Sequence, residues 1–368
     1  MKKSSTLLRS FSSRLSTRLA PSPAVAPWPP IRSAYDCWLA TELDELRADP
    51  LAPCTSAAWL GRALRLAVAA QRRLVASGTA SGATSSIDRR TIDECVDDTA
   101  ELLDACAGLR DRLDTLRGYV AATRTALHWL EGGGEAAAVR HAAAAFVECE
   151  AVERRCGAEL AKCGSNLRRL GERALLRGTR QQQAATGAHC WSDEEAVSGA
   201  RALALLAVSA LGTALAFRPR RSVCGLAGHA GSGGKAAAQW ECALQDVQRH
   251  VREEYDRRRK EGVPCMAELD AAAAAGRAVR CAVGSGRARC PETIVAEARR
   301  RCDELEGTVA AFEEKVGELH RELIAVRMLL LEWAQIAGGH EVLRFACTPA
   351  HSEASCPRLS RSKRSDLN

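Results

Sequence analysis

Hydrophobic residues near the C-terminal end of the chain recur at alternating steps of three and four positions. After two initial steps of four, the alternation continues unbroken as far as Trp333. The positions are Ile294, Ala298, Cys302, Leu305, Val309, Phe312, Val316, Leu319, Leu323, Val326, Leu330 and Trp333. This heptad pattern predicts a single helix of roughly 60 Å. A helix this long cannot bury its apolar side alone, so the pattern also predicts partner helices or a second chain.

A second pattern of the same type lies in the N-terminal half of the chain. Its positions are Ile92, Cys95, Thr99, Leu102, Cys106, Leu109, Leu113, Leu116, Val120, Thr123, Leu127 and Leu130. We expect these two long helices to lie side by side in an elongated antiparallel bundle. Self-association through a coiled coil is the alternative, and it would make the chain a homo-oligomer.

The rest of the chain also has a helical pattern. Shorter helices are predicted at about 34–48, 55–74, 135–172, 236–260 and 264–283, with a Gly/Ser/Thr loop at 77–86. Almost no stretch alternates strictly between apolar and polar residues, and aromatic residues make up only 4% of the chain. This composition favours helices over sheets. The predicted fold class is therefore all-α.

One segment, 202–217, has no charged residue. As a helix it would span roughly 24 Å, which is shorter than the ~30 Å hydrocarbon core of a bilayer. Arg201 precedes it, and three arginines lie within 218–221. In a membrane span, Arg201 and Arg218 would reach the headgroup region and make up part of this deficit, and the arginines at 218–221 would indicate a cytosolic C-terminal flank. A fully buried helix in a large bundle has the same composition, so both interpretations stay open.

The net charge of +7 is unevenly distributed. Residues 1–32 carry six basic and no acidic residues, and 358–368 carry four basic residues and one acidic residue. The remaining chain is nearly neutral, and it lacks a basic groove with interleaved aromatic residues, so we expect no nucleic-acid binding. Residues 1–33 are predicted to be a disordered, Pro-rich tail or a transit peptide, and 338–368 a flexible basic tail. A helical domain at 34–337 lies between them, with a Gly-rich loop at 225–235.

No set of residues predicts a reaction or a cofactor. The 16 cysteines include no C-x-x-C pair and no Cys/His group at zinc spacing, which favours buried thiols in a reducing compartment. Residues 228–235 look like a phosphate loop, but His229 and Ala236 depart from the required pattern. We therefore predict no catalytic, cofactor-binding or metal-binding residues.

Two stretches carry a resemblance to a known family. They are SAAWLGRALRLAVAAQRRL at 56–74 and IDECVDDTAELLDACAGLRDRL at 92–113. The second contains the matching positions Asp93, Glu94, Asp97, Asp98, Leu102, Leu103, Asp104, Cys106 and Leu109. Together they resemble the plant BYPASS-related family, which includes the ROH-type exocyst-interacting proteins. The order of the hydrophobic segment and the long C-terminal helix also matches the family's layout.

The resemblance implies a non-enzymatic plant protein linked to developmental signalling. Some members of the family bind exocyst subunits, and others associate with endomembranes. The expected function is thus a membrane-associated regulator that presents a long helical surface to protein partners, among them an exocyst subunit. The alternative is an organelle-imported structural coiled-coil protein in the plastid, and a cytoplasmic location also stays open. The acid-free N-terminus would explain import.

Overall fold

The chain divides into residues 1–32 and a helical unit that begins at Ser33. The computed structural model describes residues 33–48, 52–80, 87, 89–131, 136–154, 167, 169–171, 192–219, 239–284 and 290–346. The predicted N-terminal tail, the Gly-rich loop at 225–235 and the residues after 346 lie outside the described residues. All statements below concern the helical unit.

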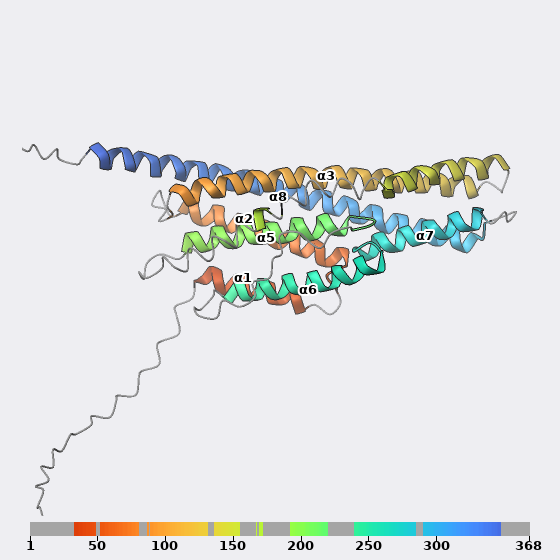
Figure 1. Cartoon of the computed structure of the whole chain (residues 1–368), viewed down its shortest axis with the longest axis horizontal. Helices are drawn as coiled ribbons and strands as arrows, with labels where there is room; N and C mark the ends of the chain where they lie inside the picture. Colours follow the sequence, from red (N-terminus) through yellow and green to blue (C-terminus); the bar gives the residue numbers. More distant parts are fainter. Residues whose placement is uncertain are drawn as a thin grey trace, which may run out of the picture. The chain divides into compact units, whose positions relative to one another are not determined.

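The described residues form helices and contain no strand, which confirms the all-α prediction. The helices are α1 (Ala34–Ala48), α2 (Ala57–Ala80), α3 (Arg89–Glu131), α5 (Ser192–Ala214), α6 (Gln239–Glu261), α7 (Ala267–Gly284) and α8 (Glu292–Ala346), and residues 136–154 are also helical (Figure 1). The two heptad patterns correspond to α3 and α8, with 43 and 55 residues.

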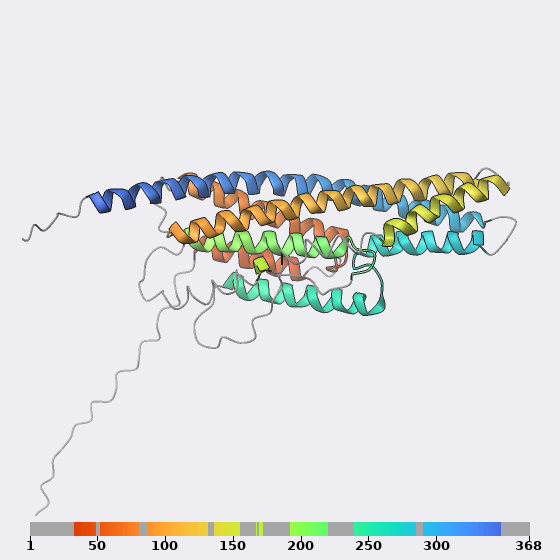
Figure 2. The same ribbon diagram turned by 45° about the horizontal axis from the view of Figure 1, so that its top comes forward.

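Helices α3 and α8 lie side by side and antiparallel (Figure 2). Arg89 Nη1 donates to the Ala334 carbonyl at 2.8 Å, near the start of α3 and the C-terminal part of α8. Towards the other end of α3, Arg124 Nη1 lies 2.7 Å from Glu306 Oε1. The residue number of the contact on α8 falls as the residue number on α3 rises, so the two helices run in opposite directions. The predicted pairing of the two long helices is thus present within one chain.

The heptad positions of both helices point into the shared core. Every predicted position of α8 except Ile294 is buried, and in α3 the exception is Leu130. Each fully buried Leu or Val side chain contributes about 1.5–3 kcal/mol through removal of apolar surface from water. The repetition of such positions along both helices explains why the pair forms.

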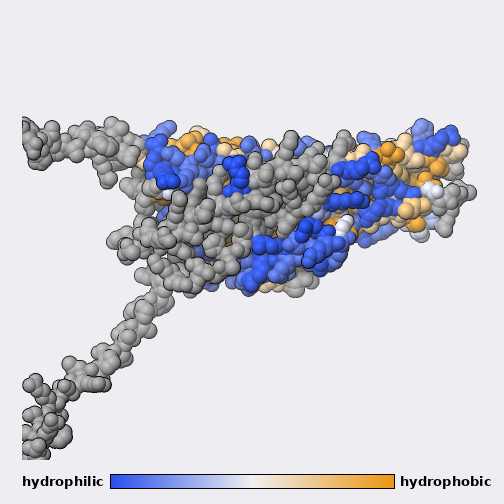
Figure 3. All heavy atoms as spheres, viewed as in Figure 1, coloured by the Kyte–Doolittle hydropathy of each residue, from blue (hydrophilic) through white to orange (hydrophobic). Residues whose placement is uncertain are grey.

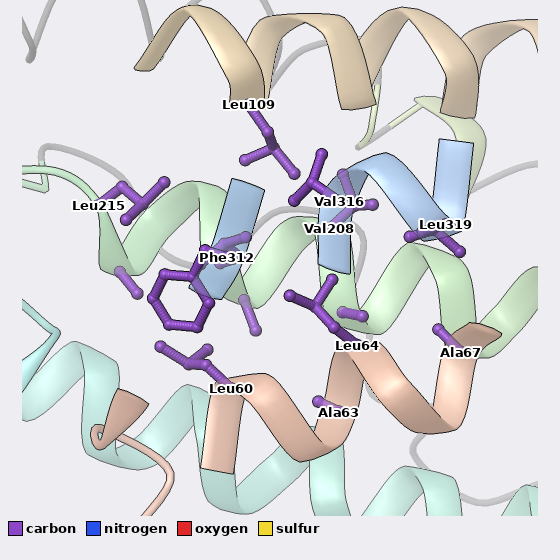
Figure 4. Close-up of a cluster of buried hydrophobic side chains, with 14 of the residues drawn as sticks. Leu60, Ala63, Leu64, Ala67, Leu109, Val208, Leu215, Phe312, Val316 and Leu319 are labelled. Atoms are coloured by element: carbon purple, nitrogen blue, oxygen red, sulfur yellow. The ribbon is translucent and has the colours of Figure 1, made fainter. Parts of the chain in front are cut away.

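Helices α2 and α5 complete this core. Leu60 and Leu64 of α2, Val208 of α5 and Val316 of α8 point toward one another, together with Leu109 of α3 (Figure 4). Small residues such as Ala63 and Ala67 let the α2 backbone approach its neighbours closely. This part of the core therefore draws side chains from four helices that are distant in sequence.

Helix α2 extends beyond its predicted end, and the loop expected at 77–86 was placed too early. The helix continues to Ala80 and includes Gly78. A Cβ atom added to Gly78 would lie 2.6 Å from Leu329 and 2.7 Å from Trp333 of α8. Gly78 is thus a contact point where α8 side chains pack onto the α2 backbone. The sequence prediction placed Gly78 in the Gly/Ser/Thr loop at 77–86.

Helices α1, α6 and α7 pack on the core through buried apolar side chains, and two capping contacts add to this packing. Asp36 of α1 is buried and accepts a hydrogen bond from the Trp240 backbone N–H of α6 at 2.9 Å. Glu268 of α7 accepts from the Ala57 backbone N–H at 3.0 Å and so caps α2. A carboxylate at a helix N-terminus satisfies a free N–H and interacts favourably with the helix dipole.

The C-terminal ends of two further helices, α5 and α8, differ from the prediction. The helix over the charge-free segment ends at Ala214, so Leu215–Phe217 are buried but not helical. Helix α8 continues past the expected domain boundary at 337 and ends at Ala346. Gly338 and Gly339 do not end it, because the following sequence, HEVLRFA, is rich in residues with good helix propensity.

Candidate interaction surface

A buried ion pair holds α5 against α3. Arg201 Nη1 lies 2.9 Å from Asp98 Oδ2, and the two side chains are 11% and 1% exposed. Gln71 of α2 donates to the Ala200 carbonyl beside them at 2.7 Å. Asp98 is one of the motif acids that carry the family resemblance, and its position gives that residue a structural role inside the bundle.

The polar groups around Arg201 line a small pocket. It is bounded by Gln71, Leu74, Cys95, Thr99, Leu102, Val197, Arg201, Leu323, Val326 and Leu330. Its volume of about 10 Å³ is close to the smallest that can hold one water molecule. The pocket is therefore far smaller than an ordinary small-molecule site.

The C-terminal end of α5 also receives a buried cation. Arg112 of α3 is only 2% exposed, and its Nη1 donates to the Gly212 carbonyl at 3.2 Å. The last carbonyl groups of a helix lack intrahelical partners and carry partial negative charge, so a positive side chain stabilises them. Arg201 and Arg112 thus fix the two ends of the apolar part of α5 to the same neighbour.

The helix over Glu194–Ala214 is the one segment, among the described residues, that is long and apolar enough to cross a membrane. Within the helical unit, 72% of its 18-residue apolar window is buried. A core helix of a bundle and a membrane span both meet this test of length and composition.

The buried cysteines have the character of core residues. Desolvation by burial raises the pKa of Cys54, Cys106 and Cys265 to about 12 in each case. A thiol with a raised pKa is protonated at neutral pH and is a poor nucleophile and metal ligand. In the part of the chain that the structure describes, no three His, Cys, Asp or Glu residues are arranged to hold a metal ion.

Three hydrophobic residues on α8 point away from the core. Ile324 is 44% exposed, Met328 63% and Leu331 37%. Their spacing of four and three places them on one face of the helix, beside the buried heptad positions. We call Ile324, Met328 and Leu331 the α8 apolar stripe. In the space-filling view, hydrophobic atoms are visible along the edge where α3 and α8 run (Figure 3).

Acidic residues of α3 lie beside the stripe. Residues 93–104 contain six acidic residues and no basic residue. Arg327 Nη1, next to Met328, donates to the Val96 carbonyl at 2.6 Å. Farther along, a Cβ atom on Gly317 would lie 3.8 Å from Arg110 Nη2. The α3 segment that contains Asp97 and Asp104 therefore runs alongside the α8 segment that precedes and includes the stripe.

The six acids of this segment have different environments. Asp98 is buried against Arg201, and Asp93 pairs with Arg89 at 3.2 Å. Asp97 and Asp104 are exposed and make no ion pair within the described ranges. They leave two uncompensated carboxylates next to an exposed apolar stripe. This combination is typical of a surface that binds another protein segment.

The sequence prediction named no site residues and missed the α8 apolar stripe. The signal was present, because Ile324, Met328 and Leu331 are apolar at helical spacing outside the heptad positions. It could not be interpreted from the sequence alone. A wider apolar face is equally expected when a third helix packs against α8, and only the structure shows that none of the described helices covers this face.

The described helices form an all-α bundle, and the longest of them carries the exposed α8 apolar stripe. The family model described as Protein BPS1 matches residues 73–332, so the chain belongs to this family. The match confirms the resemblance noted on the motif at 92–113. Searches of the curated proteins and of the solved structures find no match.

Proposed function

We propose that the chain is a non-enzymatic regulator of plant development that acts by binding protein partners through the α8 apolar stripe. The observation that carries this proposal is the exposure of Ile324, Met328 and Leu331 on one face of a helix whose other apolar side is buried. Large apolar side chains gathered on one exposed face mark an interaction site more often than scattered single residues do. Membership of the BPS1 family supports the developmental role.

The partner class that best fits this proposal is the vesicle-tethering machinery, including an exocyst subunit. A long rigid helix pair offers an extended surface of the kind that helical tethering proteins can pack against. Membrane association then arises through the partner and through the basic residues at 1–32 and 358–368, since basic segments are attracted to anionic lipid surfaces. In this proposal α5 is a core helix and the protein is peripheral.

The experiment places a photo-crosslinking amino acid at position 328 or, as a control, at the exposed position 253 of α6. Both proteins are expressed in plants that lack the native protein. We expect crosslinking at 328 but not at 253 to yield one defined adduct, which mass spectrometry then identifies. In parallel, a Met328→Ser chain should fold normally but fail to restore the growth defect of these plants. Normal rescue by Met328→Ser would refute the proposal.

The alternative is an organelle-imported structural protein. It is favoured by the six basic and no acidic residues of 1–32. The mature N-terminus of the protein isolated from plant tissue separates the two functions. Loss of about the first 30 residues, in protein recovered from plastids, would support the alternative. An intact N-terminus supports the regulator.

A further inference from the structure

We infer that the α8 apolar stripe binds a helical partner segment that is basic along one edge. The inference rests on the proposed function and names the chemistry of the partner. Asp97 and Asp104 supply its main argument, because both are exposed and neither has an ion-pair partner within the described part of the molecule.

The geometry of the stripe fits a helix. Ile324, Met328 and Leu331 span two turns of α8, or roughly 10 Å. A second helix laid along this face would present apolar residues at the matching spacing of three and four and would pack by the same rules as the core helices. Met328 lies in the middle and is the most exposed, at 63%, so it is the expected anchor. Methionine adapts well to varied partner surfaces.

The charges beside the α8 apolar stripe determine which partner helices it would bind most tightly. On the α3 side, Asp97 and Asp104 would face the edge of the docked helix, so Lys or Arg at that edge would pair with them, whereas Glu or Asp would be repelled. Two basic residues lie at the Ile324 end of the stripe: Arg321, one turn before Ile324, and Arg110 of α3, close to Gly317. Burial of the partner's apolar face supplies affinity, and the carboxylates supply selectivity.

The test uses two synthetic peptides of about 20 residues, long enough to form a helix. Both carry Leu at the same helical spacing, and they differ only in having Lys or Glu along one edge. Each peptide bears a fluorophore, and binding to the full chain is followed by fluorescence anisotropy. We expect the Lys peptide to bind about tenfold more tightly than the Glu peptide, with a preference that shrinks as salt rises.

Matched variants connect this preference to the surface. Asp97→Lys with Asp104→Lys should reverse the preference, and Met328→Ser should weaken both peptides. Glu45→Lys with Glu253→Lys makes the same change in net charge at two exposed acids outside the stripe and should leave the preference unchanged. If the control pair reverses the preference as well, overall charge is responsible and the inference is wrong.

Other outcomes of these experiments would show that something other than a basic helix occupies the α8 apolar stripe. Equal binding of both peptides, or binding of neither, overturns the basic-helix partner, although crosslinking at position 328 could still support a protein partner of different chemistry. A dimer in light scattering that Met328→Ser dissociates would mean that a second copy occupies the stripe. A peptide of residues 1–32 that displaces the Lys peptide would point to the chain's own N-terminal segment, which also overturns the inference.

Discussion

At the scale of single residues, the buried Arg201–Asp98 pair is the most sensitive point. Arg201→Met would leave Asp98, which is 1% exposed, without this cation. Removing one member of a buried pair destabilises a fold by about 3 kcal/mol, while replacing both with apolar residues is often nearly neutral. We expect Arg201→Met to lower the free energy of unfolding by this amount and Asp98→Leu with Arg201→Met to recover most of it. Urea unfolding of both variants measures the difference; equal losses would contradict the pairing.

A second residue-scale prediction concerns pH. Burial raises the pKa of Glu195 above its usual value of 4.5, an effect opposed by a hydrogen bond from the Ser33 hydroxyl at 2.7 Å. A carboxyl group with a higher pKa in the folded state binds its proton more tightly there, so stability falls as pH rises through the range above 4.5. Glu195→Gln lacks this proton equilibrium. Wild type should therefore lose stability relative to Glu195→Gln between about pH 4 and pH 7. Parallel urea titrations at both pH values test this, and an opposite sign would refute it.

At the scale of whole elements, α8 carries two faces that differ in energetic role. Leu319 is fully buried in the heptad core, whereas Ile324 on the same helix is 44% exposed. Leu319→Asp places a charge in the core and should lower the free energy of unfolding by about 4 kcal/mol. Ile324→Asp should change it by less than about 1 kcal/mol. Thermal unfolding followed by circular dichroism compares them. Equal melting temperatures would mean that the heptad face is not the core of α8.

The elements were predictable to different degrees. Heptad spacing located α3 and α8, because a long helix needs a continuous apolar side whatever its partners are. The end of α2 was not predictable at Gly78, since the glycine is explained by Leu329 and Trp333 of a helix distant in sequence. The buried carboxylate of Asp36 depends likewise on the N-terminus of α6. Features fixed by local periodicity could be predicted, and features fixed by tertiary contacts could not.

At the scale of the whole molecule, the burial of α5 in the bundle determines how the protein can associate with a membrane. Its apolar surface is largely covered by other helices, and both ends of its apolar stretch are tied to α3, by Arg201–Asp98 and by Arg112 at the Gly212 carbonyl. Transfer of α5 into a bilayer would expose the apolar faces of α2 and α3 to water and separate the buried charges. The free energy of both changes opposes insertion.

We therefore expect the full chain to leave membranes without detergent. Membranes from plants that express it are washed with high salt and then with alkaline carbonate, beside an integral membrane protein as a control. High salt should already release a large share, because basic residues at 1–32 and 358–368 bind lipid by screened electrostatics. Carbonate should release the rest. Retention in the pellet together with the integral control would mean that α5 spans the bilayer and that the bundle rearranges there. Release would assign α5 to the core and leave partner binding and the basic segments as the route to the membrane.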